Sequence, residues 1–178
     1  MLKTIGIILA ALAVIIAGVV AYASTRPDTF HVERSATVNA PAEKVFPLIN
    51  DLRAFNGWNP FAKQDPETKI SYSGPASGKG AAFSFGGGSG GSGRVEVVDA
   101  SPPAKIEMRL EMTEPMAADN QVHFTLQPEG TATRVTWSMD GGVPLVAKVL
   151  HLFVDVDSMV GGAFEQGLAD LKSVAERS

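Results

Sequence analysis

Apolar and polar positions along the chain form three patterns, and the first is an uninterrupted apolar stretch. Residues 5–23 carry no charge, and a helix of that length, rising about 1.5 Å per residue, spans a hydrocarbon core of about 30 Å. The stretch therefore predicts a single-pass membrane anchor. Lys3 is the only charge before it, which favours a cytoplasmic N-terminus with the remaining chain on the outer, periplasmic or extracellular side.

A cleaved signal segment is the alternative interpretation of this stretch. Lys3 supplies the positive start of such a segment, and Ala21, Tyr22 and Ala23 form a small-x-small cleavage pattern. The chain would then be secreted after cleavage. Because the apolar part of a signal peptide is usually only about 7–15 residues long, the uncleaved anchor is favoured.

The second pattern is alternation with a period of two residues. Residues 30–38 place an apolar side chain at nearly every second position, which predicts a half-buried first strand. Residues 39–61 change to helical spacing, where Pro47 is expected to limit or bend a first short helix and Asp51 to start a second. The order predicted here is strand, short helix, short helix.

Alternation returns beyond residue 65 and predicts six more strands. In 105–112 the apolar side chains all lie on one face and the charged ones on the other, which is typical of an antiparallel sheet with one face in water. All six segments are short and bounded by turn residues. They cover residues 69–73, 80–85, 94–99, 105–112, 121–127 and 133–139.

The glycine run at 86–93 matches two functional motifs, the dinucleotide pattern G-x-G-x-x-G and the hydrolase pattern G-x-S-x-G with Ser89 at its centre. Both motifs require a strand followed by a helix. This run lies between two predicted strands, and neither flank is large enough for a separate domain that would need a linker. A flexible hairpin tip is the remaining interpretation, since glycine readily adopts positive φ.

The third pattern is helical spacing at the C-terminal end. Apolar positions in 145–153 form one stripe and those in 160–174 form another, and the two together predict one long helix. Gly161 and Gly162 lie inside it, where each glycine costs about 1 kcal/mol relative to alanine. We therefore expect a kink or a very close backbone approach there, which would suit the floor of a cavity.

Composition narrows the function. With 178 residues, of which 45% are hydrophobic, the chain suits one domain with a substantial core. A net charge of -4 argues against nucleic acid as a partner. The absence of cysteine excludes disulfides, thiolate nucleophiles and iron–sulfur clusters, and the three histidines are scattered. No metal or other cofactor is predicted, no catalytic residue is assigned, and enzymatic activity is left open but not favoured.

Four stretches of the sequence resemble the SRPBCC, or START-like, helix-grip superfamily, specifically its polyketide cyclase/dehydrase-like branch. They are residues 33–61, 72–85, 133–139 and 164–172, within a similarity that covers about residues 29 to 176. The resemblance implies an α+β fold in which a curved seven-stranded antiparallel sheet grips a long C-terminal helix, with two short helices after the first strand. The domains expected are an anchor or signal segment with a short linker, 1–26, and the START-like domain, 27–178.

In this superfamily the space between sheet and helix holds an apolar ligand, so the resemblance implies binding of a lipid or another hydrophobic small molecule. Large, adaptable apolar side chains on inward faces or nearby loops are the candidate cavity lining. Each taken singly also suits ordinary core packing. They are Trp58, Phe61, Tyr72, Phe83, Phe85, Met108, Met112, Phe124, Trp137, Met139, Phe153 and Met159.

Arg34 interrupts the apolar face of the first strand, so its charge needs a partner. It is a candidate polar anchor that pairs with a ligand carboxylate or with Asp140, unless a bulge or the long side chain carries it to water. Three functions remain open: a membrane-anchored carrier or sensor of apolar ligands, a polyketide cyclase- or hydratase-like enzyme, and a protein-interaction domain without ligand. The oligomeric state is not predicted.

Overall fold

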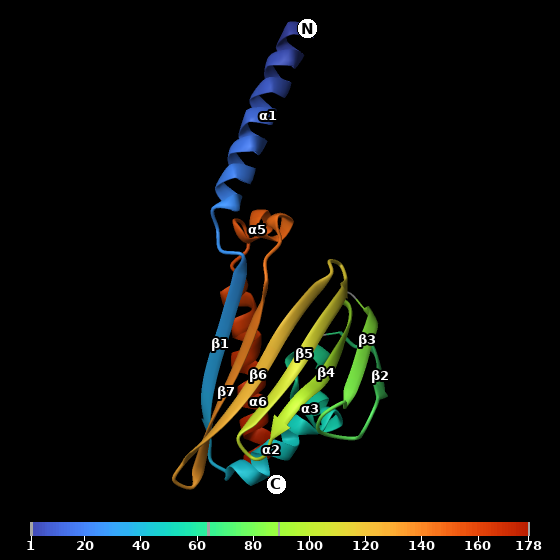
Figure 1. Cartoon of the computed structure of the whole chain (residues 1–178), viewed down its shortest axis with the longest axis vertical. Helices are drawn as coiled ribbons and strands as arrows, with labels where there is room; N and C mark the ends of the chain where they lie inside the picture. The colour runs from blue at the N-terminus through green and yellow to red at the C-terminus, as the bar shows by residue number, and fades with distance from the viewer. Residues whose placement is uncertain (1, 64, 89, 178) are drawn as a thin grey trace.

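The computed structural model describes residues 2–63, 65–88 and 90–177, which form an N-terminal helix and an α+β domain (Figure 1). The helices are α1 (Leu2–Ser24), α2 (Ala42–Asn50), α3 (Leu52–Trp58), α4 (Pro60–Lys63), α5 (Leu145–His151) and α6 (Val156–Arg177). The strands are β1 (Thr29–Val38), β2 (Lys69–Ser73), β3 (Ala82–Gly88), β4 (Gly91–Ser101), β5 (Lys105–Glu114), β6 (Ala118–Glu129) and β7 (Ala132–Gly142).

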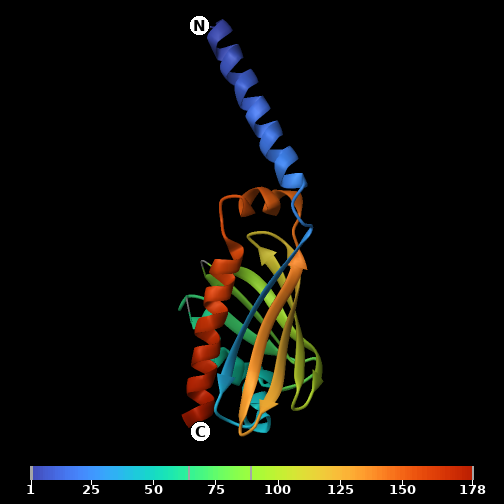
Figure 2. The same ribbon diagram turned by 90° about the vertical axis from the view of Figure 1, so that its left-hand side faces the viewer.

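The strands form one curved antiparallel sheet in the order β1-β7-β6-β5-β4-β3-β2. The long helix α6 lies across its concave face and packs mainly along β1 (Figure 2). The register brings Thr29 opposite Gly142, Met112 opposite Ala118 and Gly88 opposite Gly91. These pairs lie at the end of the sheet nearer to α1, because α1 leads directly into β1. The predicted helix-grip α+β fold is confirmed.

The two short helices after β1 are present, and a third, α4, follows them. Asp51 starts α3 as predicted, since its carboxylate accepts hydrogen bonds from the backbone N–H groups of Arg53 and Ala54. Pro47 does not end α2, which continues to Asn50. Burial of other α2 side chains against the core offsets the one backbone hydrogen bond that a proline removes.

The predicted long C-terminal helix is confirmed as α6, but it does not include residues 145–153, which the combined apolar stripe had joined to it. The chain forms α5, leaves helical structure at residues 152–155 and starts again as α6. Asp155 makes this new start, because its carboxylate accepts hydrogen bonds from the backbone N–H and the hydroxyl of Ser158, at 3.1 and 2.7 Å. From there α6 continues through Gly161 and Gly162 to Arg177.

The glycine run forms the predicted hairpin tip between β3 and β4. The strands extend further into it than expected, since Gly88 still pairs with Gly91. Gly87 and Gly91 have φ of 85° and 89°, in the left-handed region that favours glycine. Ser89, the centre of the hydrolase-like motif, lies outside the described residues.

Helix α1 projects from the domain with its apolar side chains exposed; Ile7 and Val14, for example, are 70% and 72% exposed (Figure 1). By length and composition it is a candidate membrane span or signal sequence. It contacts α5, and Ala23 in its last turn is fully buried. Only residues 25–28 separate α1 from β1.

Candidate functional site: a cavity between the sheet and the C-terminal helix

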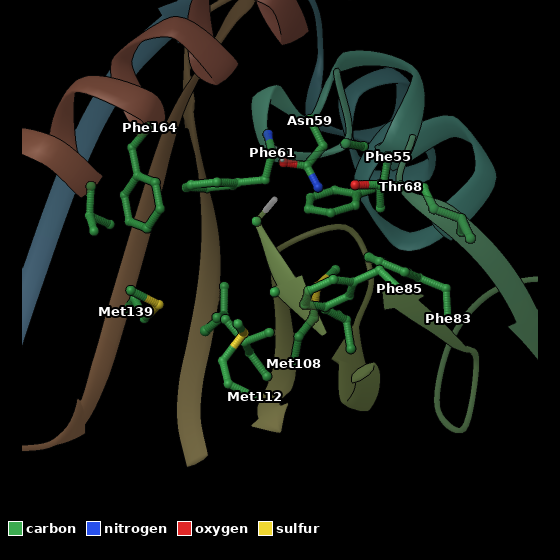
Figure 3. Close-up of a pocket in the computed structure, with 18 of the residues that line it drawn as sticks. Phe55, Asn59, Phe61, Thr68, Phe83, Phe85, Met108, Met112, Met139 and Phe164 are labelled. Atoms are coloured by element: carbon green, nitrogen blue, oxygen red, sulfur yellow. Dashed lines mark hydrogen bonds between the residues drawn. The ribbon is translucent and has the colours of Figure 1, made fainter. Parts of the chain in front are cut away.

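A cavity of about 490 Å³ lies between the sheet and α6, bordered by side chains from α3, α4, the α4–β2 connection, the sheet and α6 (Figure 3). Phe61 lines it and is 45% exposed, so the cavity reaches the surface beside α4. Its described lining comprises Phe55, Asn59, Phe61, Ala62, Asp65, Thr68, Ile70, Phe83, Phe85, Gly90, Gly91, Val95, Met108, Leu110, Met112, Val122, Trp137, Met139, Val160 and Phe164.

The structure brings seven of the twelve candidate lining residues together around this cavity. They are Phe61, Phe83, Phe85, Met108, Met112, Trp137 and Met139. In Figure 3 the labelled side chains among them gather from β3, β5, β7 and α4 around a common space. Their role as ligand contacts stays a prediction.

The other five candidates lie elsewhere. Trp58 and Phe124 are 1% and 0% exposed and belong to the packed core. Tyr72 packs against the rim of that core, where its hydroxyl accepts a hydrogen bond from Asn56. Phe153 and Met159 are 78% and 62% exposed. The break between α5 and α6 explains Phe153, which lies in it and not on a continuous helix face. Met159 lies in the first turn of α6, next to Val160, which does line the cavity.

Stacked aromatic rings close one side of the cavity. The rings of Trp137 and Phe164 lie 4.1 Å apart at 11°, and Phe61 meets both edge-on. A Cβ built on Gly167 would lie 2.7 Å from Cζ3 of Trp137 and 2.9 Å from Cδ of Pro60. This glycine therefore lets the indole approach the backbone of α6 closely.

Among the buried side-chain polar atoms of the described cavity lining, Nε1 of Trp137 lacks a hydrogen-bond partner, in a residue only 3% exposed. Cζ3, which faces Gly167, and Nε1 lie on opposite edges of an indole ring. The N–H therefore points away from that contact with α6. A buried donor without an acceptor is costly. The atom has almost no exposed surface beside the cavity, so a ligand acceptor would be favoured here only if the indole moves slightly to meet it.

Other polar side chains lie near the opening of the cavity. Oδ1 of Asn59 accepts from the backbone N–H of Phe61 at 3.2 Å, and Oδ1 of Asp65 accepts from the backbone N–H of Glu67 at 2.9 Å. Thr68 completes this set. Within the described lining, Asp65 is the one titratable side chain, and no group of three or more His, Asp or Glu residues suited to a metal occurs in the described part of the chain.

Some lining residues were missed from the sequence although a signal existed. Leu110 shares the inward face of β5 with Met108 and Met112, and Phe164 shares a helix stripe with Val160. Asn59 gives no such signal, because a polar residue between two short helices is typical of a solvent-exposed turn.

Arg34 lies on the inward face of β1, as the alternation predicted, but does not pair with Asp140. Its Nη2 and Nε bind Asp157 and Glu165 of α6 at 2.9 and 2.8 Å. Asp140 instead bonds Nδ1 of His31, at 2.7 Å. Arg34 is also absent from the described cavity lining, so the two acids on α6 take the place of the ligand carboxylate that was expected to pair with it.

Gly161 makes this arrangement possible, because a Cβ there would collide with the guanidinium of Arg34. A close approach thus exists at Gly161, where the guanidinium of Arg34 meets the helix backbone. The expected cavity floor is not there, because neither Gly161 nor Gly162 belongs to the described cavity lining. Hydrogen bonding to Arg34 holds the pKa of Asp157 below its ordinary value, while Asp157 and Glu165 raise the pKa of Arg34. The three charges fasten β1 to the first turns of α6.

The fold and cavity agree with a family model described as "Polyketide cyclase / dehydrase and lipid transport", which matches residues 29–176. The chain belongs to this family. The match begins at β1 and leaves out α1, so the family relationship concerns the α+β domain. No curated protein matches the chain.

Several solved structures share the fold of this chain at low sequence identity. A protein from Chromobacterium violaceum is 17% identical with a TM-score of 0.58, covering 85% of this chain and 99% of its own. A protein from Mesorhizobium loti is 19% identical with a TM-score of 0.59, covering 84% and 98%. Ara h 8.0201 is 12% identical with a TM-score of 0.55, covering 84% and 99%. These similarities show the fold alone.

Proposed function

We propose that this protein is a membrane-anchored domain that binds a hydrophobic small molecule or lipid in its internal cavity and acts as a carrier or sensor. The observation that carries the proposal is the cavity of about 490 Å³ lined by aromatic and methionine side chains. Ligand sites typically have about 300–1,000 Å³ and a mostly apolar lining with a few polar groups. Membership in a family whose description includes lipid transport supports the same ligand class.

The anchor part of the proposal rests on α1 and its junction with the domain. Ala23 is buried and α1 contacts α5, and Nζ of Lys148 in α5 donates to the backbone oxygen of Arg26 at 2.8 Å. Nη2 of Arg26 donates to the Tyr22 hydroxyl at 2.7 Å, and such side chains are common where a helix leaves a membrane. These contacts favour a helix that stays attached, with the domain, 27–178, on the outer side.

Fractionation of cells that express a C-terminally tagged chain tests the anchor. The tagged protein should remain in the membrane fraction after washing at high salt and at alkaline pH. Protease added from the outer side should digest the domain. Recovery of a shortened soluble species that begins near Ser24 would show a cleaved signal segment instead.

A cavity-filling variant tests ligand binding. Val122 lines the cavity on β6, whereas Thr125 lies on the outer face of the same strand. Val122→Phe should weaken the binding of a fluorescent fatty acid at least about tenfold without loss of stability, since the new ring enters existing space. Thr125→Phe should leave binding unchanged. The domain without residues 1–26 is suitable, because the family match covers residues 29–176 and leaves out α1.

A cyclase- or hydratase-like enzyme is the second candidate, and Asp65 at the cavity is the observation that favours it. General acid–base chemistry needs a titratable group within reach of the substrate. Turnover of aromatic polyketide substrates that disappears in Asp65→Asn would support an enzyme. A protein-interaction domain without ligand is favoured instead if solvent extraction of the purified domain and mass spectrometry recover no apolar compound and the fatty acid does not bind.

A further inference from the structure

Exposed apolar side chains outside α1 concentrate at one place in the fold. Among the described residues beyond α1, eight large apolar side chains are exposed, and six of them lie between residues 145 and 159. We name these six the docking surface: Leu145, Val146, Leu150, Phe153, Val154 and Met159, with exposed fractions of 44%, 65%, 49%, 78%, 45% and 62%. A soluble surface rarely gathers apolar side chains in this way without a partner.

The position of the docking surface beside α1 indicates what covers it. Helix α5 contacts α1, and Ala23, the last residue of the apolar stretch, is buried at this junction (Figure 1). A span of residues 5–23 matches the thickness of a hydrocarbon core of about 30 Å, so Ala23 lies close to the membrane boundary. Since α5 packs at the level of Ala23, its exposed side chains lie at that boundary as well.

An ion pair between a buried lysine and an exposed aspartate fixes α5 in this position. Lys148 is only 6% exposed, and its Nζ lies 2.5 Å from Oδ1 of Asp28 and 2.8 Å from the backbone oxygen of Arg26. Lysine is almost never buried unless it is paired. The inward side of α5 is thus tied to the α1–β1 linker, and Val146 and Leu150 remain on its outward side.

We infer that the docking surface inserts into the lipid surface from which α1 emerges. The inference rests on the proposed membrane anchor and adds a second membrane contact formed by the domain itself. Met116, in the β5–β6 connection at the same end of the sheet, is also exposed, at 41%. The segment also carries Asp155 and Asp157, whose carboxylates bond Ser158 and Arg34. It therefore offers no surplus of positive charge to anionic lipid, and its membrane contact relies on the apolar side chains.

Insertion also brings the cavity to the membrane. Met159 belongs to the docking surface, while the next residue, Val160, lines the cavity. The tip of the β3–β4 hairpin, where Gly90 and Gly91 line the cavity, is at the end of the sheet nearer to α1. An apolar ligand would therefore have a short route between bilayer and cavity.

Site-specific spin labels on the full chain test the inference. Because the sequence has no cysteine, each single-cysteine variant carries one nitroxide. Phe153→Cys reports on the docking surface, Val14→Cys on α1, and Thr131→Cys on the β6–β7 turn at the opposite end of the sheet. Full-length protein in phosphatidylcholine vesicles is measured for collision with oxygen, which is enriched in lipid, and with a water-soluble nickel chelate.

The label at residue 153 should collide mainly with oxygen, at a shallower depth than the label at residue 14, and the label at residue 131 mainly with the chelate. A label at 153 in water while that at 14 is in lipid would overturn the docking inference and leave the anchor intact. Protection of residue 153 from both reagents would overturn it in favour of a protein partner. A label at 14 in water would overturn both the inference and the proposed anchor.

A functional measurement separates docking from ligand binding. The double variant Val146→Ser with Phe153→Ser should slow transfer of a fluorescent fatty acid from vesicles to the full-length protein several-fold, with the equilibrium affinity unchanged. Val146 and Phe153 are 65% and 78% exposed, so the fold should tolerate the change. A transfer rate equal to that of the unmodified protein would overturn the inference. If the unmodified protein does not bind the fatty acid at all, the proposed function itself is contradicted.

Discussion

The two halves of the space between the sheet and α6 differ in how they are filled. In the half farther from α1, α2 and α3 pack beneath the sheet, and Val45, Ile49 and Leu52 are 0%, 0% and 1% exposed. In the half nearer to α1 the same sheet and helix enclose the cavity. Both halves are lined by large apolar side chains, so the position of α2 and α3, not hydrophobicity, decides which half is hollow.

Truncation on α6 should give the largest difference between the halves. Leu168 lies in the packed half and is 1% exposed. Leu168→Ala should lower the free energy of unfolding by about 2–5 kcal/mol, because the smaller side chain leaves a new cavity. Val160 borders the existing cavity, and Val160→Ala should cost less than about 1 kcal/mol. Urea unfolding of the domain measures both, and equal losses would show that the near half is packed as tightly as the far half.

Two glycines of α6 should respond with opposite signs. Gly167→Ala forces a Cβ against the rings of Trp137 and Pro60 and should destabilise the domain by about 1–3 kcal/mol. Gly162 is exposed, and a Cβ added there would meet nothing within 4 Å, so Gly162→Ala should stabilise α6 by about 0.5–1 kcal/mol. Thermal unfolding measures the stability of both variants. A Gly167→Ala variant as stable as the wild type would contradict close packing between the indole of Trp137 and α6.

The hollow half should discriminate between ligands through the indole of Trp137. Trp137→Phe keeps an aromatic ring against Phe164 but removes the buried N–H. Ligands with a carbonyl or hydroxyl acceptor should lose about 0.5–1.5 kcal/mol of binding free energy, and pure hydrocarbons should lose little. Competition against a fluorescent fatty acid provides the measurement. Equal losses for both ligand types would assign Trp137 an apolar role only.

The smallest expected effect is a pH dependence at the ion pairs between β1 and α6. The pKa of Asp157 is lowered from its ordinary 3.8, mainly by its hydrogen bond to Arg34. The unfolded carboxyl titrates at its ordinary value, so this stabilisation is fully present above 3.8 and is lost as the pH falls through the lowered folded value. Arg34→Gln should therefore lower the Tm at neutral pH and converge with the wild type in acid.

The control for this measurement is Arg134→Gln, which removes an exposed guanidinium at the opposite end of β1 and β7. Its Tm difference from the wild type should not converge in the same acid range. A constant difference for Arg34→Gln across the whole pH range would show that the arginine stabilises the fold by packing against Gly161 rather than by its charge.

Much of this comparison could be predicted from the sequence, because alternation and helix signals are local. Inward positions on β5 identified Met108 and Met112, and Asp51 marked the start of α3. The break between α5 and α6 was missed because residues 152–154 are all apolar and continue the helical stripe. Periodicity also cannot tell a core from a cavity wall, so Phe124 and Met108 looked alike before their neighbours were known.

The short linker between α1 and β1 limits where an anchored domain can work. Residues 25–28 reach at most about 14 Å when fully extended, at about 3.3–3.6 Å per residue. A neighbouring bilayer is therefore beyond the range of the domain while α1 is embedded. Transfer of an apolar molecule to any other compartment would need a soluble acceptor that comes to this membrane, so a carrier or sensor of this kind would load and release its ligand at one membrane only.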